Sequence, residues 1–110
     1  MKVTLSQEKD VSVVSIEGSI DGKTAPMVRQ EIQPTLETAR SVILDLSKVD
    51  YLSSAGLRLL LLIYREFTAK HGKVVLLGVS EDIKTVMSHT GFLNFFSLAN
   101  SKAEALQTLS

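Results

Sequence analysis

The chain has 110 residues, of which 45% are hydrophobic and 22% are charged, a balance that predicts a folded protein with one modest core. Twelve basic and twelve acidic side chains give a formal net charge of zero, and the absence of a basic run argues against a nucleic-acid partner. There is no cysteine, which excludes disulfides and thiolate metal sites. No apolar stretch reaches the roughly 20 residues of a membrane span, so we expect a soluble, cytoplasmic protein without a membrane partner.

The first twenty residues predict a β-hairpin. Residues 2–8 and 11–17 alternate in a β-rich pattern on either side of Lys9-Asp10, which is typical of two antiparallel strands. The second run carries apolar residues on both faces, which indicates that it is the more deeply buried strand. A loop is expected after it, punctuated by Gly18, Asp21 and Gly22.

A helix is expected after this loop. Thr24 is its predicted N-cap, and Pro26 falls in the first turn, where its missing N–H does no harm. Apolar residues then recur every four positions over about ten residues, which predicts one buried face. Pro34 falls inside this pattern, so we expect it to kink or shorten the helix.

The middle of the chain predicts a buried strand followed by a long helix. Residues 41–46 are nearly all apolar, as expected for a central parallel strand, and a short polar loop should follow them. The next helix is expected to begin after Ser53, to extend to Lys70 and to end at His71-Gly72.

The remaining residues predict a further strand, two short helices and one apolar segment with weak strand character. These are a strand over 73–78, a helix capped by Ser80, the apolar segment over 92–98 and a terminal helix that begins at Ser101. The order of elements predicts an α/β fold, with a single-layer mixed β-sheet of four to five strands packed by about four helices. We expect one domain over residues 1–110.

Two adjacent serines stand between the buried strand and the long helix. The hydroxyls of Ser53 and Ser54 should lie at the N-terminal end of a helix, just past the carboxyl end of a strand, where sites in open α/β sheets usually lie. Free N–H groups and the positive end of the helix dipole favour an anion there. A phosphate on either hydroxyl would add roughly −1.5 to −2 charges, which the helix tolerates but an apolar contact with a partner would not. The position therefore suits a phosphorylation switch.

Four segments resemble the motifs of bacterial anti-sigma factor antagonists, which are stand-alone STAS domains. They are Gly18-Ser19-Ile20-Asp21, Val42-Ile43-Leu44-Asp45-Leu46, Ser54-Ala55-Gly56-Leu57 and Gly91-Phe92-Leu93-Asn94-Phe95-Phe96. Their order and spacing match over almost the whole chain. The resemblance implies a STAS fold and a regulatory binding protein rather than an enzyme.

The resemblance also implies the partners. An unphosphorylated antagonist of this family binds an anti-sigma factor or a related serine kinase of the histidine-kinase-like ATPase class, and thereby releases the target of that kinase. Phosphorylation by the kinase ends the binding, and a PPM-type serine phosphatase restores it. No cofactor is expected, because the chain has neither a Gly-rich phosphate loop nor a cluster of metal ligands.

By position, the phosphoacceptor that the resemblance implies is Ser54, with Ser53 as the second choice, and Asp21 should lie in the loop beside it. Ser53 stands where the family usually has aspartate, and a serine can still cap the helix there. Gly56 leaves the turn uncrowded for a partner's backbone, and Arg58 follows on the helix. The expected partner-binding residues are Asp21, Ser53, Ser54, Gly56 and Arg58.

The helix after the serines is apolar on more than one face. The stripe expected to face the sheet consists of Leu57, Leu60, Leu61 and Tyr64. The residues of a second stripe are Leu59, Leu62 and Ile63. Either a neighbouring helix covers this second stripe, or it forms an exposed apolar strip on which a partner could dock.

Three other functions fit parts of the pattern. A serine hydrolase needs a base beside its nucleophile, but the chain has no Gly-x-Ser-x-Gly elbow, and His71 should lie ~25 Å along the helix from Ser54. A phosphoaspartate receiver built on Asp45 would need an acidic pair to hold a metal, and Asp10 lies in the predicted hairpin turn instead. A STAS subunit of a lipid-transport or stress-signalling assembly, never phosphorylated, stays open as the alternative.

Overall fold

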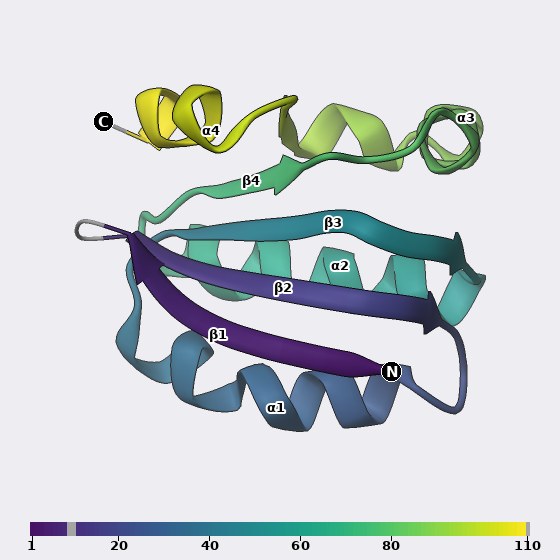
Figure 1. Cartoon of the computed structure of the whole chain (residues 1–110), viewed down its shortest axis with the longest axis horizontal. Helices are drawn as coiled ribbons and strands as arrows, with labels where there is room; N and C mark the ends of the chain where they lie inside the picture. The colour runs from purple at the N-terminus through teal and green to yellow at the C-terminus, as the bar shows by residue number, and fades with distance from the viewer. Residues whose placement is uncertain (9–10, 110) are drawn as a thin grey trace.

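The computed structural model describes residues 1–8 and 11–109, which form a five-stranded sheet and the helices packed on it (Figure 1). Strands β1 (Lys2–Glu8) and β2 (Val11–Ile20) are antiparallel along their length, from Lys2 opposite Glu17 to Glu8 opposite Val11. The predicted pairing of the hairpin is therefore confirmed. Its predicted turn at Lys9-Asp10 lies outside the described residues.

Three further strands extend the sheet from β2, all parallel to it. They are β3 (Val42–Leu52), β4 (Val74–Leu77) and β5 (Ser97–Ala99), and the strand order is β1-β2-β3-β4-β5. The helices are α1 (Ala25–Thr38), α2 (Ser54–Ala69), α3 (Glu81–Thr90) and α4 (Lys102–Leu109), with a short 3₁₀ helix η1 (Phe92–Phe95). This architecture confirms the predicted mixed α/β sheet of four to five strands packed by about four helices.

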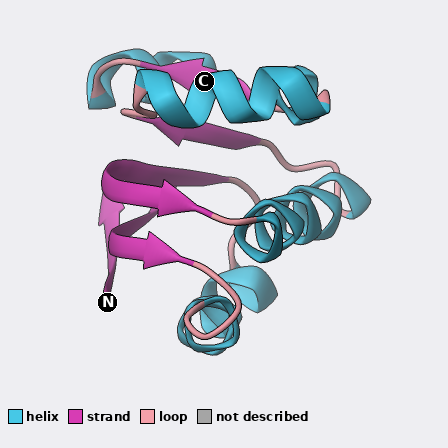
Figure 2. Ribbon diagram, turned by 90° about the vertical axis from the view of Figure 1, so that its right-hand side faces the viewer, coloured by secondary structure: helices cyan, strands magenta, loops and turns pink. Residues whose placement is uncertain are grey.

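Alternation along the strands divides the core between the two faces of the sheet. In β3, Val42 and Leu44 belong to the larger core, to which α1, α2 and α3 contribute. Ile43 belongs to a smaller core that contains Ala105 of α4. Figure 2 shows α1 and α2 together on one side of the strands. Because β4 contributes to both cores, all four of its residues are apolar and buried.

Both central strands are longer than the sequence predicted. β2 continues through Gly18 to Ile20, and β3 continues past residue 46 to Leu52, where a polar loop was expected. The two extensions pair with each other, with Ile20 opposite Leu52, so each strand satisfies the backbone groups of the other. The register shifts just after Gly18, and its φ of 109° is one that glycine adopts readily.

Helix α1 is also longer than predicted, because Pro34 does not end it. The helix has 14 residues and continues to Thr38. Pro34 has no N–H to donate to the Gln30 carbonyl, and both residues lie on the exposed side of the helix. Of the two expected effects of Pro34, the shortening was therefore wrong, and the kink stays a prediction. Val28 and Ile32 lie fully buried on the predicted apolar face.

The second apolar stripe of α2 is covered by α1. Leu59 and Ile63 are buried, and Arg29 of α1 reaches Glu66 of α2 at 3.9 Å. Leu62 is half-buried. Of the two explanations for this stripe, the neighbouring helix is confirmed and the exposed strip is wrong.

Serine side chains cap three helices, and the sequence predicted two of these caps, at Ser53 and Ser80. The hydroxyl oxygens of Ser53, Ser80 and Ser101 accept from the backbone N–H groups of Gly56, Ile83 and Glu104, at 3.3, 3.2 and 3.1 Å respectively. Each bond satisfies one N–H that the helix itself leaves without a partner.

The apolar segment expected over 92–98 contains two elements rather than one. Its first part is η1, and only Ser97–Ala99 forms a strand, which pairs with β4. Aromatic rings connect this segment to α2, since the Tyr64 ring lies 5.4 Å from that of Phe95 and 5.5 Å from that of Phe96. These contacts place η1 against the second half of α2.

Gly56 determines how closely α2 approaches the sheet. A Cβ at this position would lie 2.6 Å from the carbonyl oxygen of Ile20 and 2.6 Å from a methyl of Leu52. No side chain fits in that space, because real Cβ contacts are never so short. The first turn of α2 therefore rests directly on the ends of β2 and β3.

Replacing Gly56 by alanine should destabilise the protein. Because the added Cβ would meet the Ile20 backbone carbonyl, which cannot turn aside as a side chain can, we take the upper end of the usual overpacking cost, about 3 kcal/mol. The better helix propensity of alanine returns about 1 kcal/mol, so we expect a net loss of about 2 kcal/mol in urea unfolding. Gly22→Ala is the matched control, since nothing lies within 4 Å of its added Cβ. A Gly56→Ala variant as stable as the wild type would show that the close approach is not a constraint.

Candidate functional site

Two strands and two helices meet at one end of the sheet. β2 and β3 both finish there, and α1 and α2 both begin there, because each helix follows its strand directly. The N–H of Ser53 donates to the carbonyl of Ile20 at 3.0 Å, which ties the two strand ends together. Asp21 and Ser53 each follow one of these ends. We call this region, with Ser54 and the first turns of α1 and α2, the serine end.

The two serines at this end have different environments. Ser53 is half-buried, and its hydroxyl oxygen accepts from the N–H of Gly56. Ser54 is the first residue of α2 and is exposed, and its hydroxyl has no hydrogen bond within the described parts of the chain. The hydroxyl of Ser54 is therefore free to meet another protein, whereas that of Ser53 is used in the fold.

Asp21 holds the loop that leads into α1. Its carboxylate accepts from the backbone N–H of Lys23 at 2.9 Å and of Thr24 at 3.0 Å. These bonds, that of Thr24 first, hold the pKa of Asp21 below its usual value, because they stabilise the charged form. Asp21 is therefore ionised at neutral pH and has a fixed position at the serine end.

Thr24 occupies the N-cap position of α1 but does not cap it with its side chain, which corrects the sequence prediction. Its hydroxyl donates to the Ser19 carbonyl at 2.7 Å and accepts from the Asp21 N–H at 2.9 Å. The backbone at Thr24 is already helical, with φ −91° and ψ −25°, so the hydroxyl binds back into the preceding loop.

Gly56 and Arg58 lie on opposite sides of α2. Gly56 is buried, and the space that its missing side chain leaves is taken by Ile20 and Leu52, so it positions the helix. Arg58, one turn after Ser54, is exposed, and it forms no ion pair with any residue that the structure describes. Its guanidinium is therefore available at the surface.

Two exposed apolar side chains at the serine end were missed in the sequence. Met27, in the first turn of α1, is 54% exposed, and Tyr51, near the end of β3, is 56% exposed. The sequence did contain a signal for each of them. Met27 falls outside the four-residue spacing of the buried face of its helix, and Tyr51 stands only two positions before the serines. Large exposed apolar side chains beside polar groups are typical of the centre of a protein interface.

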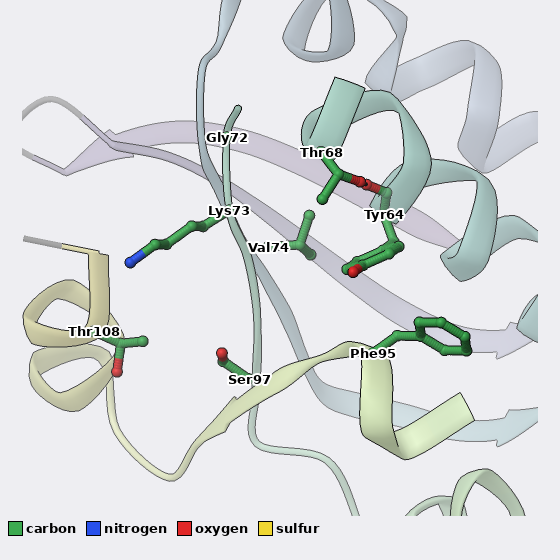
Figure 3. A pocket seen from close by; sticks show the side chains of 8 residues that line it. All are labelled: Tyr64, Thr68, Gly72, Lys73, Val74, Phe95, Ser97 and Thr108. Carbon is green, nitrogen blue, oxygen red and sulfur yellow. The ribbon is translucent and has the colours of Figure 1, made fainter. Parts of the chain in front are cut away.

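The candidates for other chemistry lie elsewhere or have other partners. His71 is at the far end of α2 from Ser54, and Asp45 lies within β3, where its carboxylate accepts from the hydroxyl of Ser47 at 2.6 Å. A hollow of about 240 Å³ is formed by Tyr64 and Thr68 with the starts of β4 and β5 and the end of α4 (Figure 3). It adjoins the second half of α2, so it is separate from the serines.

Neither a metal-binding cluster nor a membrane-spanning helix occurs in the described part of the chain. The described residues contain no group of three or more histidine and acidic side chains placed to hold a metal ion. Within the same residues, no helix has the length and the apolar character that a membrane crossing requires.

Known proteins are similar to this chain in sequence and in fold. The model of the STAS domain family matches residues 2–105. BtrV of Bordetella bronchiseptica, to which the role of anti-sigma factor antagonist is provisionally assigned, is 31% identical over 106 residues, or 96% of this chain and 91% of BtrV. An anti-sigma factor antagonist of Mycobacterium paratuberculosis is 28% identical, with a TM-score of 0.88 over 98% of this chain and 92% of that one.

A third similar protein has been solved in a modified state. SpoIIAA of Bacillus, described as a cell fate determinant in its phosphorylated form, superposes with a TM-score of 0.75 over 99% of this chain and 100% of its own, at 20% identity. The family match covers nearly the whole chain, and these proteins agree with it in fold. The chain therefore belongs to the STAS domain family, where the relatives it resembles are anti-sigma factor antagonists.

Proposed function

We propose that this protein is an anti-sigma factor antagonist controlled by phosphorylation of Ser54. Unphosphorylated, it binds an anti-sigma factor that is also a serine kinase and so releases the target of that kinase. The observation that carries the proposal is the exposed, unbonded hydroxyl of Ser54 at the first position of α2. The names of the relatives supply the kind of partner.

The charge of a phosphate explains how the switch would act. Roughly −1.5 to −2 charges appear on Ser54 at neutral pH, at a helix end where an exposed anion is stabilised by about 0.3–1 kcal/mol. The modified protein therefore stays folded. The same charge placed between two proteins loses its water and weakens the contact. Phosphorylation would thus end binding without unfolding the antagonist.

The surroundings of Ser54 fit a protein partner. Met27 and Tyr51 offer apolar anchors, and Asp21 and Arg58 offer one charge of each sign. Such a mixture of apolar and charged groups is typical of protein interfaces. The kinase would belong to the histidine-kinase-like ATPase class, and a PPM-type phosphatase would reverse the modification in the cytoplasm, as the resemblance of the sequence implies.

A charge at Ser54 should end partner binding. We expect Ser54→Asp to bind the cognate kinase at least about tenfold more weakly than Ser54→Ala, a difference of about 1.4 kcal/mol, in isothermal titration calorimetry. Ser88→Asp, an exposed serine of α3, is the matched control and should bind like the wild type. Equal affinities of Ser54→Asp and Ser54→Ala would rule out the switch.

Mapping the phosphate should separate the two serines. Incubation with the kinase and ATP should modify Ser54 in the wild type and in Ser53→Ala, and intact mass should show no added phosphate in Ser54→Ala. Because Ser53 caps α2, Ser53→Ala should also lose about 0.5–2 kcal/mol of stability. A protein from cells that never carries phosphate would support the alternative, an unphosphorylated STAS subunit.

Asp21 should stabilise the fold in a pH-dependent way. Its lowered pKa means that its stabilising bonds are fully present above the ordinary value of 3.8 and are lost as the pH falls through the lowered value. Asp21→Asn should therefore be less stable than the wild type at pH 7, and the two urea-unfolding free energies should converge in acid. Glu31→Gln, an exposed acid of α1, is the control. A constant difference at every pH would show that the charge of Asp21 has no part in the fold.

Arg58 should contribute to partner binding without contributing to stability. We expect Arg58→Ala to weaken kinase binding by at least about 1 kcal/mol, as buried arginines at interfaces often do, and to leave thermal unfolding within about 0.5 kcal/mol of the wild type. Arg65→Ala, seven positions along the same helix, is the matched control. Binding by Arg58→Ala as tight as that by Arg65→Ala would show that the partner does not depend on Arg58.

A further inference from the structure

The solvent-facing side of the first two turns of α2 consists of two residues. Among residues 54–60, only Ser54 and Arg58 are exposed, and the others are buried or half-buried. The Ser54 hydroxyl therefore has one exposed neighbour on this part of the helix, and that neighbour is a cation.

Helix geometry brings these two side chains together. Residues four positions apart lie on the same face of a helix, with Cβ atoms about 5–6 Å apart. Helical side chains lean toward the N-terminus, so a side chain at position 58 extends over the turn that contains Ser54. An acidic group four positions before a basic one is also the favourable order for an ion pair on a helix.

Arg58 has no acidic partner among the described residues. It forms no ion pair with any of them, and the first turn of α2 has no acidic residue. The acids at the ends of β2 and β3 have other partners. The Asp21 carboxylate accepts from two backbone N–H groups of its own loop, and that of Asp50 accepts from the Ser19 hydroxyl at 2.8 Å. A second exposed cation, Lys23, lies in the loop with Asp21.

We propose that a phosphate on Ser54 captures the Arg58 guanidinium, so that phosphorylation removes a cation from the binding surface at the same time as it adds an anion. This pairing rests on the proposed function, which supplies the phosphate. Arg58 then has two states. It faces a partner while Ser54 is unmodified, and it is bound within its own helix once Ser54 carries phosphate.

Three effects favour the pair. Arginine and phosphate often form two parallel N–H···O bonds, which are stronger than bonds between neutral groups. The free backbone N–H groups at the start of α2 favour the phosphate at the same place. The second pKa of phosphoserine lies near 6, so at pH 7 the group carries nearly two negative charges and keeps about one after it pairs with Arg58.

Capture of Arg58 adds a second loss for the partner. An acidic side chain of the partner that pairs with Arg58 would lose its counter-charge and meet the phosphate instead. A charge left buried without its partner costs more than a missing contact. The partner should therefore be a protein that presents an acidic side chain to Arg58.

The phosphate itself reports the pairing without any partner present. Phosphoserine is encoded at position 54 of the full chain, and its second pKa is followed by phosphorus NMR. A neighbouring cation stabilises the dianion and lowers this pKa. The pKa should therefore lie about 0.3 higher in Arg58→Gln than in the wild type, which is the size of an ion pair between residues four positions apart. Arg58→Lys should fall between the two, because lysine keeps the charge but not the two parallel bonds.

Two other cations provide the controls for this titration. Arg65→Gln removes an exposed arginine farther along α2, and Lys23→Gln removes the exposed lysine of the loop. Each should leave the pKa of the phosphate as it is in the wild type. Thermal unfolding of the unphosphorylated variants checks that each one folds. The same pKa in the wild type and in Arg58→Gln, or a rise in Lys23→Gln as large as in Arg58→Gln, would overturn the capture.

Kinase binding tests the consequence for the switch. If the phosphate captures Arg58, phosphorylation and Arg58→Ala remove the same contact, so their effects should overlap. Phosphorylation should then weaken binding by roughly fivefold less in Arg58→Ala than in the wild type, which corresponds to the contact of about 1 kcal/mol expected for Arg58. Equal weakening in both proteins would overturn the proposal. Equal affinity of the phosphorylated and unphosphorylated wild type would instead reject the proposed switch, and the pKa of the phosphate would still decide whether Arg58 is captured.

Discussion

The arrangement of this protein depends on one close contact, between the first turn of α2 and the carbonyl group that ends β2. Gly56 lies so near the Ile20 carbonyl that a Cβ would come within 2.6 Å of it, and the Ser53 N–H bonds the same carbonyl at 3.0 Å. The start of α2 is thereby fixed to β2 as well as to β3, the strand that it follows. Asp21, the next residue after Ile20, comes beside the serines for this reason.

This contact gives Ser54 a fixed position on a regular element instead of a place in a loose loop. The cap at Ser53 satisfies a helix N–H, and Ser54 is left exposed at the next position. A rigid, exposed hydroxyl can be covered by a partner with little loss of conformational entropy. Its phosphorylation then acts where the partner would sit, so the proposed switch needs no change of conformation in the antagonist.

The sequence predicted the elements better than it predicted their lengths. The caps at Ser53 and Ser80 were found because capping is a local interaction between neighbouring residues. The extensions of β2 and β3 were missed because each exists through pairing with the other, and residues 47–51 alone look like a polar loop. The exposure of Tyr51 was missed for the same reason, since it depends on where β3 ends. Met27 was visible only as a residue outside a periodic pattern.

The first turn of α2 carries no acidic residue, so a phosphate on Ser54 would change the sign of the charge in that turn. α3 carries Glu81 and Asp82 in its first turn, where they offset the positive end of the helix dipole, whereas the first turn of α2 has no acidic residue. Ser53 caps α2 without adding charge. A phosphate on Ser54 would therefore be the first negative charge in that turn. It would turn the partial positive charge of the helix end into a net negative charge, whereas a turn with an aspartate at position 53 would already be negative before phosphorylation.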